Sequence, residues 1–344
     1  MNASDAIGAH GTTLQPLVLS GHTRTVYSVG FHPDGTQFVS GSTDGTVRTW
    51  NTHQARETRP PLACDDGIVA AMAISNDGRW IATSGESWRI LLWDAFTHTQ
   101  VAKGNHDGGG GGGKVHAGPV ECLAFSADAT KLVSGAGDTT VAVWGVPTGE
   151  HFAGPFRGHL EGVTCVVFSP DGNRIASADT NDVRIQESDS GTLVLPVIDM
   201  SMSRAWALAW APAPNDHLLY VSYNNRIRGI DVTTGAVCLE WTAHALTITC
   251  IALSRDGQFI ASSSNYARTV QLWDTATQQE CVPALQHGSS VRCVAISPDG
   301  SHVITGGEDS TVYVWPIRND LAGIDEEASP STSVCVVRPC FSFC

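Results

Sequence analysis

Three sets of histidine, serine or threonine, and aspartate recur in the chain, and each has the composition of the system that activates a nucleophile in hydrolases. The sets are His22, Ser40 and Asp44; His116, Ser134 and Asp138; and His287, Thr305 and Asp309. The spacing from histidine to aspartate is the same in every set, and a tryptophan follows each histidine at a second constant spacing. An enzyme has no use for three identical, widely separated catalytic centres. We therefore predict that these side chains have a repeated structural role.

A run of six glycines before Lys114 is a second candidate for chemistry, because its spacing matches the phosphate-binding loop G-x-x-x-x-G-K. Such a loop needs a hydroxyl side chain after the lysine and a helix N-terminus behind it. Val115 stands in the place of the hydroxyl, and Gly118 and Pro119 stand where the helix would begin. We find no unrepeated nucleophile with a base and no metal-ligand spacing. The sequence predicts a non-enzymatic protein with no cofactor and no metal site.

Seven apolar segments of strand length recur along the chain, each followed by turn residues, as in VYSVGFHPDG and VRCVAISPDG. Their anchoring apolar residues lie at intervals of 43, 51, 43, 42, 43 and 43 residues. These residues are Phe31, Ile74, Phe125, Phe168, Trp210, Leu253 and Ile296. The one long interval contains the glycine run. We therefore predict that residues 104–115 form a flexible insertion between two repeats.

Each unit continues with two more apolar segments joined by short turns, and segments such as HFAGPF supply a fourth strand. Four short strands at a period near 43 residues are typical of one blade of a β-propeller. We predict an all-β fold, a seven-bladed β-propeller of four-stranded antiparallel blades over residues 14–316. The strand from Leu14 to Leu19 would complete the last blade and close the ring, which hides sheet edges.

These repeats resemble the WD40 family over about residues 15–316. Gly21-His22 and Gly158-His159 match the Gly-His of that family, and Trp93-Asp94 and Trp273-Asp274 match its Trp-Asp. The resemblance implies a buried hydrogen-bond relay in each blade, which would leave its members unsatisfied if one were lost. The relay residues it predicts are His22, Ser40, Asp44 and Trp50; His116, Ser134, Asp138 and Trp144; His244, Ser263 and Trp273; and His287, Thr305, Asp309 and Trp315.

The other blades depart from this pattern. Blade six has Ala267 in the place of the aspartate, and blade two has Asp65 in the place of the histidine. Blades four and five have Gln186 and Ile230 in the place of the tryptophan, so we predict the weakest relays there. Four cysteines follow the same period, each three residues before an anchoring residue, and are predicted to be core thiols. They are Cys122, Cys165, Cys250 and Cys293.

Charge and composition exclude several classes of partner. With 34 acidic and 20 basic residues the net charge is −14, which disfavours DNA and RNA and makes a basic partner easier to bind. No apolar run approaches the roughly 20 residues of a membrane span, and the N-terminus has no signal-peptide pattern. We expect a monomer without membrane contact that is intracellular, cytoplasmic rather than nuclear. Residues 1–13 are predicted to be a flexible arm and residues 317–344 a disordered tail.

The leading functional hypothesis is a non-catalytic scaffold or adaptor that binds a peptide or another protein on the loop face around the central channel. Arginine and aromatic side chains dominate binding hot spots. The residues predicted on that face are Tyr27, Glu121, Arg204, Trp206, Tyr223, Tyr266, Arg292 and Glu308. Each could also be an ordinary exposed loop residue. Fold alone does not name the partner.

Two alternatives remain within the binding class. The repeat style is similar to that of fungal proteins that join a NACHT domain to WD40 repeats, which would make this chain the sensor of a signalling protein. The other alternative is the substrate receptor of a ubiquitin ligase, which the short N-terminal arm disfavours. A phosphoinositide-binding propeller would need a second arginine in Phe156-Arg157-Gly158.

Overall fold

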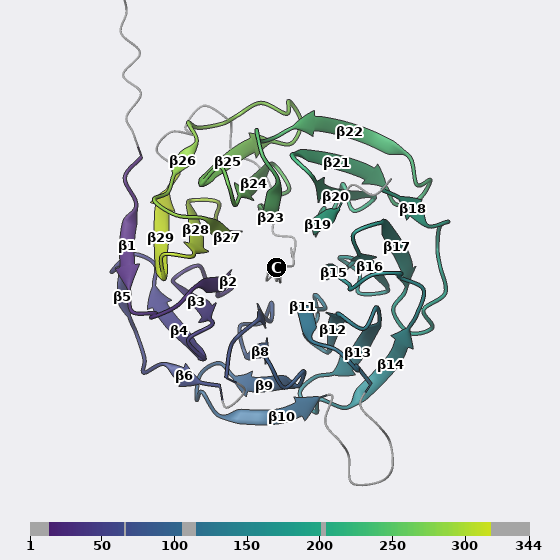
Figure 1. Cartoon of the computed structure of the whole chain (residues 1–344), viewed down its shortest axis with the longest axis horizontal. Helices are drawn as coiled ribbons and strands as arrows, with labels where there is room; N and C mark the ends of the chain where they lie inside the picture. The colour runs from purple at the N-terminus through teal and green to yellow at the C-terminus, as the bar shows by residue number, and fades with distance from the viewer. Residues whose placement is uncertain (1–13, 65–66, 105–114, 201–203, 318–344) are drawn as a thin grey trace, which may run out of the picture.

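The structure is a computed structural model that describes residues 14–64, 67–104, 115–200 and 204–317. Seven antiparallel sheets stand around a central axis like the blades of a propeller (Figure 1). Every regular element in the described residues is a strand. The described residues contain no helix that is long and apolar enough to cross a membrane. The predicted arm, most of the glycine insertion, Asp65 and nearly all of the predicted tail lie outside the described residues.

Each blade runs from an inner strand at the axis to an outer strand at the rim. The first four blades are β2 (Val26–Phe31), β3 (Gln37–Ser42), β4 (Thr46–Asn51), β5 (Arg56–Glu57) and β6 (Leu62–Ala63); β7 (Ala71–Ile74), β8 (Trp80–Ser84), β9 (Ile90–Asp94) and β10 (Gln100–Gly104); β11 (Val120–Phe125), β12 (Lys131–Ala136), β13 (Val141–Gly145) and β14 (His151–Phe156); and β15 (Cys165–Phe168), β16 (Arg174–Ala178), β17 (Asp182–Glu187) and β18 (Ile198–Asp199). Blade one has a fifth strand because β5 and β6 pair separately with β4.

The remaining three blades follow the same order, except that the last takes its outer strand from the start of the chain. They are β19 (Ala205–Trp210), β20 (Leu218–Tyr223), β21 (Arg226–Asp231) and β22 (Val237–Thr242); β23 (Ile248–Leu253), β24 (Phe259–Ser264), β25 (Thr269–Asp274) and β26 (Leu285–Gln286); and β27 (Val291–Ile296), β28 (His302–Gly307), β29 (Thr311–Pro316) and β1 (Leu17–Ser20). β1 pairs antiparallel with β29, from Leu17 opposite Val314 to Ser20 opposite Thr311. The predicted closure of the ring is confirmed.

The core lies between neighbouring blades, where inner and second strands of one blade meet the next. A glycine in the second strand makes room for this packing: a Cβ on Gly135 would come within 2.5 Å of Val163 in the next blade. Cys122 lies beside the same glycine, and its thiol donates to the carbonyl groups of Gly135 and Val163, each at 3.7 Å. All four periodic cysteines are at most 1% exposed. Their period therefore reflects a small residue at each junction between blades.

Candidate functional site

The relay of blade one joins the strands β3 and β4, the turn between them and the turn before β2. The Oγ atom of Ser40 accepts the indole N–H of Trp50 at 2.7 Å and lies 2.7 Å from Nε2 of His22. On the other side of the imidazole, Nδ1 is 2.9 Å from the carboxylate of Asp44, which also accepts the backbone N–H of Thr23. Ser40 has the partners of a nucleophile, but it is 0% exposed, so no substrate can reach it. The relay fixes the turn to the blade.

Blade three has the same relay with one additional hydroxyl. The Oγ atom of Ser134 accepts the N–H of Trp144 at 2.7 Å and lies 2.6 Å from Nε2 of His116. Nδ1 of His116 is 2.7 Å from the hydroxyl of Thr140, which in turn donates to Asp138 at 2.6 Å. The carboxylate itself is 3.6 Å from the imidazole. Thr140 therefore carries part of the contact between the two.

The structure corrects the prediction for Asp309 in blade seven. Thr305 accepts the N–H of Trp315 at 3.3 Å and lies 2.8 Å from Nε2 of His287, as in the other relays. The carboxylate of Asp309, however, accepts the hydroxyl of Tyr313 at 2.7 Å. The tyrosine ring lies edge-on to His287, with ring centres 5.0 Å apart. Asp309 thus bonds to Tyr313 and not to His287, and burial lowers the pKa of His287 to about 4 although the charge of Asp309 acts in the opposite direction.

The prediction for Ser263 in blade six was also wrong. Nε2 of His244 lies 2.8 Å from Oγ of Ser262, which accepts the N–H of Trp273 at 2.9 Å. Ser263 faces the other side of the sheet and lies 3.1 Å from the hydroxyl of Thr249. No aspartate opposes the burial of His244, whose pKa falls to about 4.

The length of one turn explains this error. Four residues separate Ser264 from Thr269 in blade six, whereas three separate Ser42 from Thr46 in blade one. The spacing from the tryptophan back to the relay serine therefore points to Ser263, one residue too far along the chain. The spacing from the histidine forward to the serine points correctly to Ser262. By that second count Tyr266, rather than Ala267, takes the position of the aspartate.

Blade four, predicted to be among the weakest, has the most strongly charged relay. His159 lies 2.8 Å from Oγ of Ser177, and its Nδ1 lies 3.4 Å from Asp179 and 2.9 Å from Asp182. Burial alone would lower the pKa of His159, but the contacts with the two aspartates outweigh it and raise the pKa. Gln186, in the place of the tryptophan, is buried.

These three side chains place ligand-type atoms within 4.8 Å of one another. Their charges are nevertheless balanced inside the protein. Asp179 accepts four backbone N–H groups at 2.6–3.1 Å, and Arg184 pairs with Asp182 at 3.1 Å. Burial would raise the pKa of Asp179, but the contacts with His159 and these N–H groups hold it well below its usual range.

Blades two and five lack the histidine. In blade two, Thr83 accepts the N–H of Trp93 at 2.9 Å, and the thiol of Cys64 points to the same hydroxyl at 3.9 Å. In blade five, the buried Ile230 replaces the tryptophan, and Oγ of Ser222 accepts the backbone N–H of Ala207. Blade five is the one blade without a side-chain relay among the described residues.

One spacing is constant wherever the histidine is described. The relay hydroxyl lies 18 residues after it in five blades, at Ser40, Ser134, Ser177, Ser262 and Thr305. This count identifies Ser177 and Ser262, which the comparison with tryptophan positions missed. The aspartates of blade four have no such signal, because neither of them follows its histidine at the spacing that the other blades share.

A second feature lies at the mouth of the channel, at the start of the inner strands. One position per blade recurs there: Tyr27, Ala70, Glu121, Thr164, Trp206, Thr249 and Arg292. In five blades the pairing of the first two strands skips this residue, so that it forms a bulge. Bulges turn a side chain out of the sheet. The four long side chains among the seven are half-buried.

Two arginines at the mouth lie over aromatic rings. The guanidinium of Arg292 in blade seven is 5.8 Å from the ring centre of Tyr27, so this contact joins blades seven and one. The same guanidinium pairs with Glu308 of its own blade. The guanidinium of Arg204, which is exposed, is 5.7 Å from the ring centre of Trp206. Both distances are within the range of cation–π attraction.

The structure separates Tyr266 from Tyr223, two of the three tyrosines predicted on the loop face. Tyr266 is 73% exposed in the turn before β25. Tyr223 is 7% exposed, and its hydroxyl accepts a hydrogen bond from Arg228 at 3.2 Å. Tyr223 therefore supports blade five from inside and is not offered to a partner, which corrects its prediction.

The family model of the WD domain, G-beta repeat, matches residues 14–51, 61–94, 114–145, 151–185, 235–274 and 279–316. The chain belongs to the WD40 repeat family. It has 26% identity to the guanine nucleotide-binding protein subunit beta of Solanum tuberosum over 322 residues, which cover 75% of this chain and 81% of that protein. It has 24% identity to human striatin-4, over 78% of this chain and 38% of striatin-4.

One stretch departs from the WD40 pattern. The unmatched residues 186–234 contain β19, β20 and β21, three of the four strands of blade five. The blade without a relay is thus also the blade that the family model does not match. It is the blade that carries Arg204 and Trp206.

Proposed function

We propose that the chain is a non-catalytic scaffold that binds a segment of another protein at the mouth of its channel, with blade five as the main contact. WD40 propellers bind other proteins in general, and one relative is named as a subunit of a larger protein. The observation that carries the proposal is the bulged Trp206 with the exposed Arg204 over its ring.

Blade five has lost the relay yet keeps a tryptophan in a bulge at the mouth, where the equivalent positions of blades two, four and six are small and buried. A half-buried tryptophan beside an exposed arginine combines two of the residue types that dominate binding hot spots. Tyr266 of blade six adds an exposed ring at the neighbouring turn. The propeller ring holds these side chains in place, so binding does not have to order them first.

The test is affinity purification of the Trp206→Ala, Tyr266→Ala double variant, with co-purifying proteins identified by mass spectrometry. We expect loss of the specific partners at an unchanged melting temperature, since truncation of a hot-spot residue costs about 2 kcal/mol or more. Phe152→Ala is the control, because Phe152 is also an aromatic side chain open to solvent, at 53% exposure, but lies on the outer strand β14. A double variant that keeps its partners and melts earlier would contradict the proposal.

A further inference from the structure

The position two residues before the relay tryptophan recurs on the third strand of every blade. In blades one, four and five it is an arginine paired with an acid of the same blade. Arg48 pairs with Glu57 at 2.8 Å, Arg184 with Asp182 at 3.1 Å, and Arg228 with Glu240 at 3.0 Å. In blade six the same position holds Gln271.

Blade one shows what the arginine does. Nη1 of Arg48 lies 2.8 Å from the point that a Cβ on Gly21 would occupy, and the ring of Trp50 lies 3.0 Å from the same point. Its partner Glu57 stands opposite Trp50 in the pairing of β4 with β5. The guanidinium therefore fills the space between the turn before the blade and the outer strand, beside the indole.

Blade six has the acid without the arginine. Glu280 stands opposite Trp273, which is the position of Glu57 opposite Trp50. Gln271 donates its amide N–H to Glu280, but its buried Oε1 has no donor among the described residues. No cation in the described part of the chain lies within ion-pair distance of Glu280. Glu280 is exposed, whereas Glu57 is half-buried beneath Arg48.

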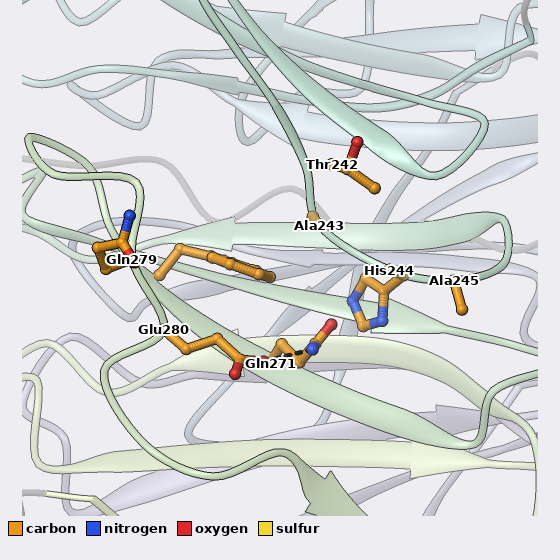
Figure 2. Close-up of a pocket in the computed structure, with 8 residues that line it drawn as sticks. Thr242, Ala243, His244, Ala245, Gln271, Gln279 and Glu280 are labelled. Carbon is orange, nitrogen blue, oxygen red and sulfur yellow. Dashed lines mark hydrogen bonds between the residues drawn. The ribbon is translucent and has the colours of Figure 1, made fainter.

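The shorter side chain leaves a groove of about 520 Å³ at the rim between blades five and six (Figure 2). It is lined by Thr242, Ala243, His244, Ala245, Gln271, Trp273, Gln279 and Glu280. In the figure His244 and Gln271 border the same space, with Glu280 beside Gln271. His244, with its pKa lowered to about 4 by burial, is neutral at pH 7 and does not repel a cation there.

We propose that this groove binds an arginine side chain of a partner protein, which takes the role that Arg48 plays in blade one. Its guanidinium would donate to the carboxylate of Glu280 and to Oε1 of Gln271, with its face against Trp273. Ala243 stands in the place of Gly21, and its methyl group makes the guanidinium lie farther out, toward solvent. This rim site is separate from the channel mouth, so it goes beyond the function proposed above.

The separate acceptors of the groove and its flat indole favour arginine over lysine. The acceptors belong to two different side chains beside a flat indole, and a planar guanidinium with five donors fits such a set better than a compact ammonium. The net charge of −14 also favours a basic partner.

The experiment uses the full chain labelled with 5-fluorotryptophan and observed by ¹⁹F NMR. The probe is the tripeptide N-acetyl-Ala-Arg-Ala-amide, with the matched lysine tripeptide beside it. We expect the arginine peptide to shift the resonance that Trp273→Phe removes, and the lysine peptide to bind at least about tenfold more weakly. Glu280→Gln should weaken the response by about tenfold or more, the usual effect of losing a charged hydrogen bond.

Gln271→Arg should abolish the response, because the chain's own arginine then fills the groove and pairs with Glu280. The end of that flexible side chain can move aside from Ala243, because the Arg48 atoms nearest to the corresponding point at Gly21 belong to its guanidinium group. Glu57→Gln in blade one and Trp206→Ala at the mouth are controls that should leave the response unchanged. Equal binding of the two peptides, no shift of the Trp273 resonance, or a response retained in Gln271→Arg would overturn the proposal.

Discussion

Blades four and six hold the same histidine–serine pair in opposite electrical surroundings. His159 lies on Ser177 at 2.8 Å and His244 on Ser262 at 2.8 Å, so the first half of the relay is identical. Blade four adds two aspartates, which raise the pKa of its histidine, and blade six adds none, so burial lowers the pKa to about 4. The residues from the turn before the third strand to the start of that strand, and not the histidine–serine pair, set the charge of a relay.

The largest expected effect is the difference between removing the two histidines. His159→Ala would remove the imidazole that lies between the buried carboxylates of Asp179 and Asp182 and leave Arg184 as the cation paired with Asp182. Breaking a buried ion pair costs about 3–5 kcal/mol. His244→Ala strands only neutral groups, at about 1–3 kcal/mol. Urea denaturation at pH 6 measures both. Equal losses would mean that the aspartates of blade four do not depend on His159.

The second effect is a pH dependence of opposite sign in the two blades. His159, with a raised pKa, contributes stability that is full below the unfolded value of about 6.5 and is lost as pH rises through the folded pKa. His244 stays neutral in the folded state, so stability is lost as pH falls from about 6.5 toward about 4.

For His244 this loss amounts to about 2 kcal/mol between pH 7 and pH 5. The unfolding free energies of the wild type and of His244→Gln at the two pH values measure it, because glutamine does not titrate. If the variant loses as much stability as the wild type on acidification, other groups cause the loss.

A smaller effect would make blade six resemble blade four. Tyr266 follows His244 at the same spacing at which Asp44 follows His22. Tyr266→Asp should therefore raise the pKa of His244 and stabilise the fold by about 1 kcal/mol, the usual net value of one hydrogen bond. NMR titration of the imidazole measures the pKa. An unchanged pKa would show that the longer turn holds residue 266 away from the relay.

The smallest effect is expected at Asp309. Its carboxylate accepts the hydroxyl of Tyr313 at an exposed position, and His287 bonds to Leu285 and Thr305 instead, so Asp309→Asn should change stability by less than about 0.5 kcal/mol. The matched variant Asp44→Asn removes a contact with a buried histidine and should cost about 1–3 kcal/mol. Thermal unfolding compares the two. A large loss of stability in Asp309→Asn would show that Asp309 is a member of the relay after all.

The sequence was sufficient for the fold because the repeat is periodic: seven apolar segments at a nearly constant interval determine the number of blades and the closing strand. It was also sufficient for the relays of blades one and three, whose turns have the standard length. It failed at Ser263 because one additional turn residue shifts a count made from the tryptophan. It failed at Asp309 and Tyr223 because a neighbouring side chain, Tyr313 or Arg228, takes the polar group.

The rim groove was invisible to the sequence for a different reason. It depends on which residue stands opposite Trp273, and that pairing follows from the irregular outer segment of blade six. No spacing predicts that Glu280 matches Glu57. The equivalence of Glu280 and Glu57 becomes visible only when the strand pairing opposite the two tryptophans is known.

Closure of the ring by β1 also sets an order in time during synthesis. β1 leaves the ribosome before every other strand of the ring, and its partner β29 leaves last. At a synthesis rate of about 5–20 residues per second, β1 waits about 15–60 s for the edge that it will cover. During that interval Leu17 and Val18, which remain 42% and 57% exposed even in the finished ring, are available to any other unpaired strand edge, including that of a neighbouring nascent chain.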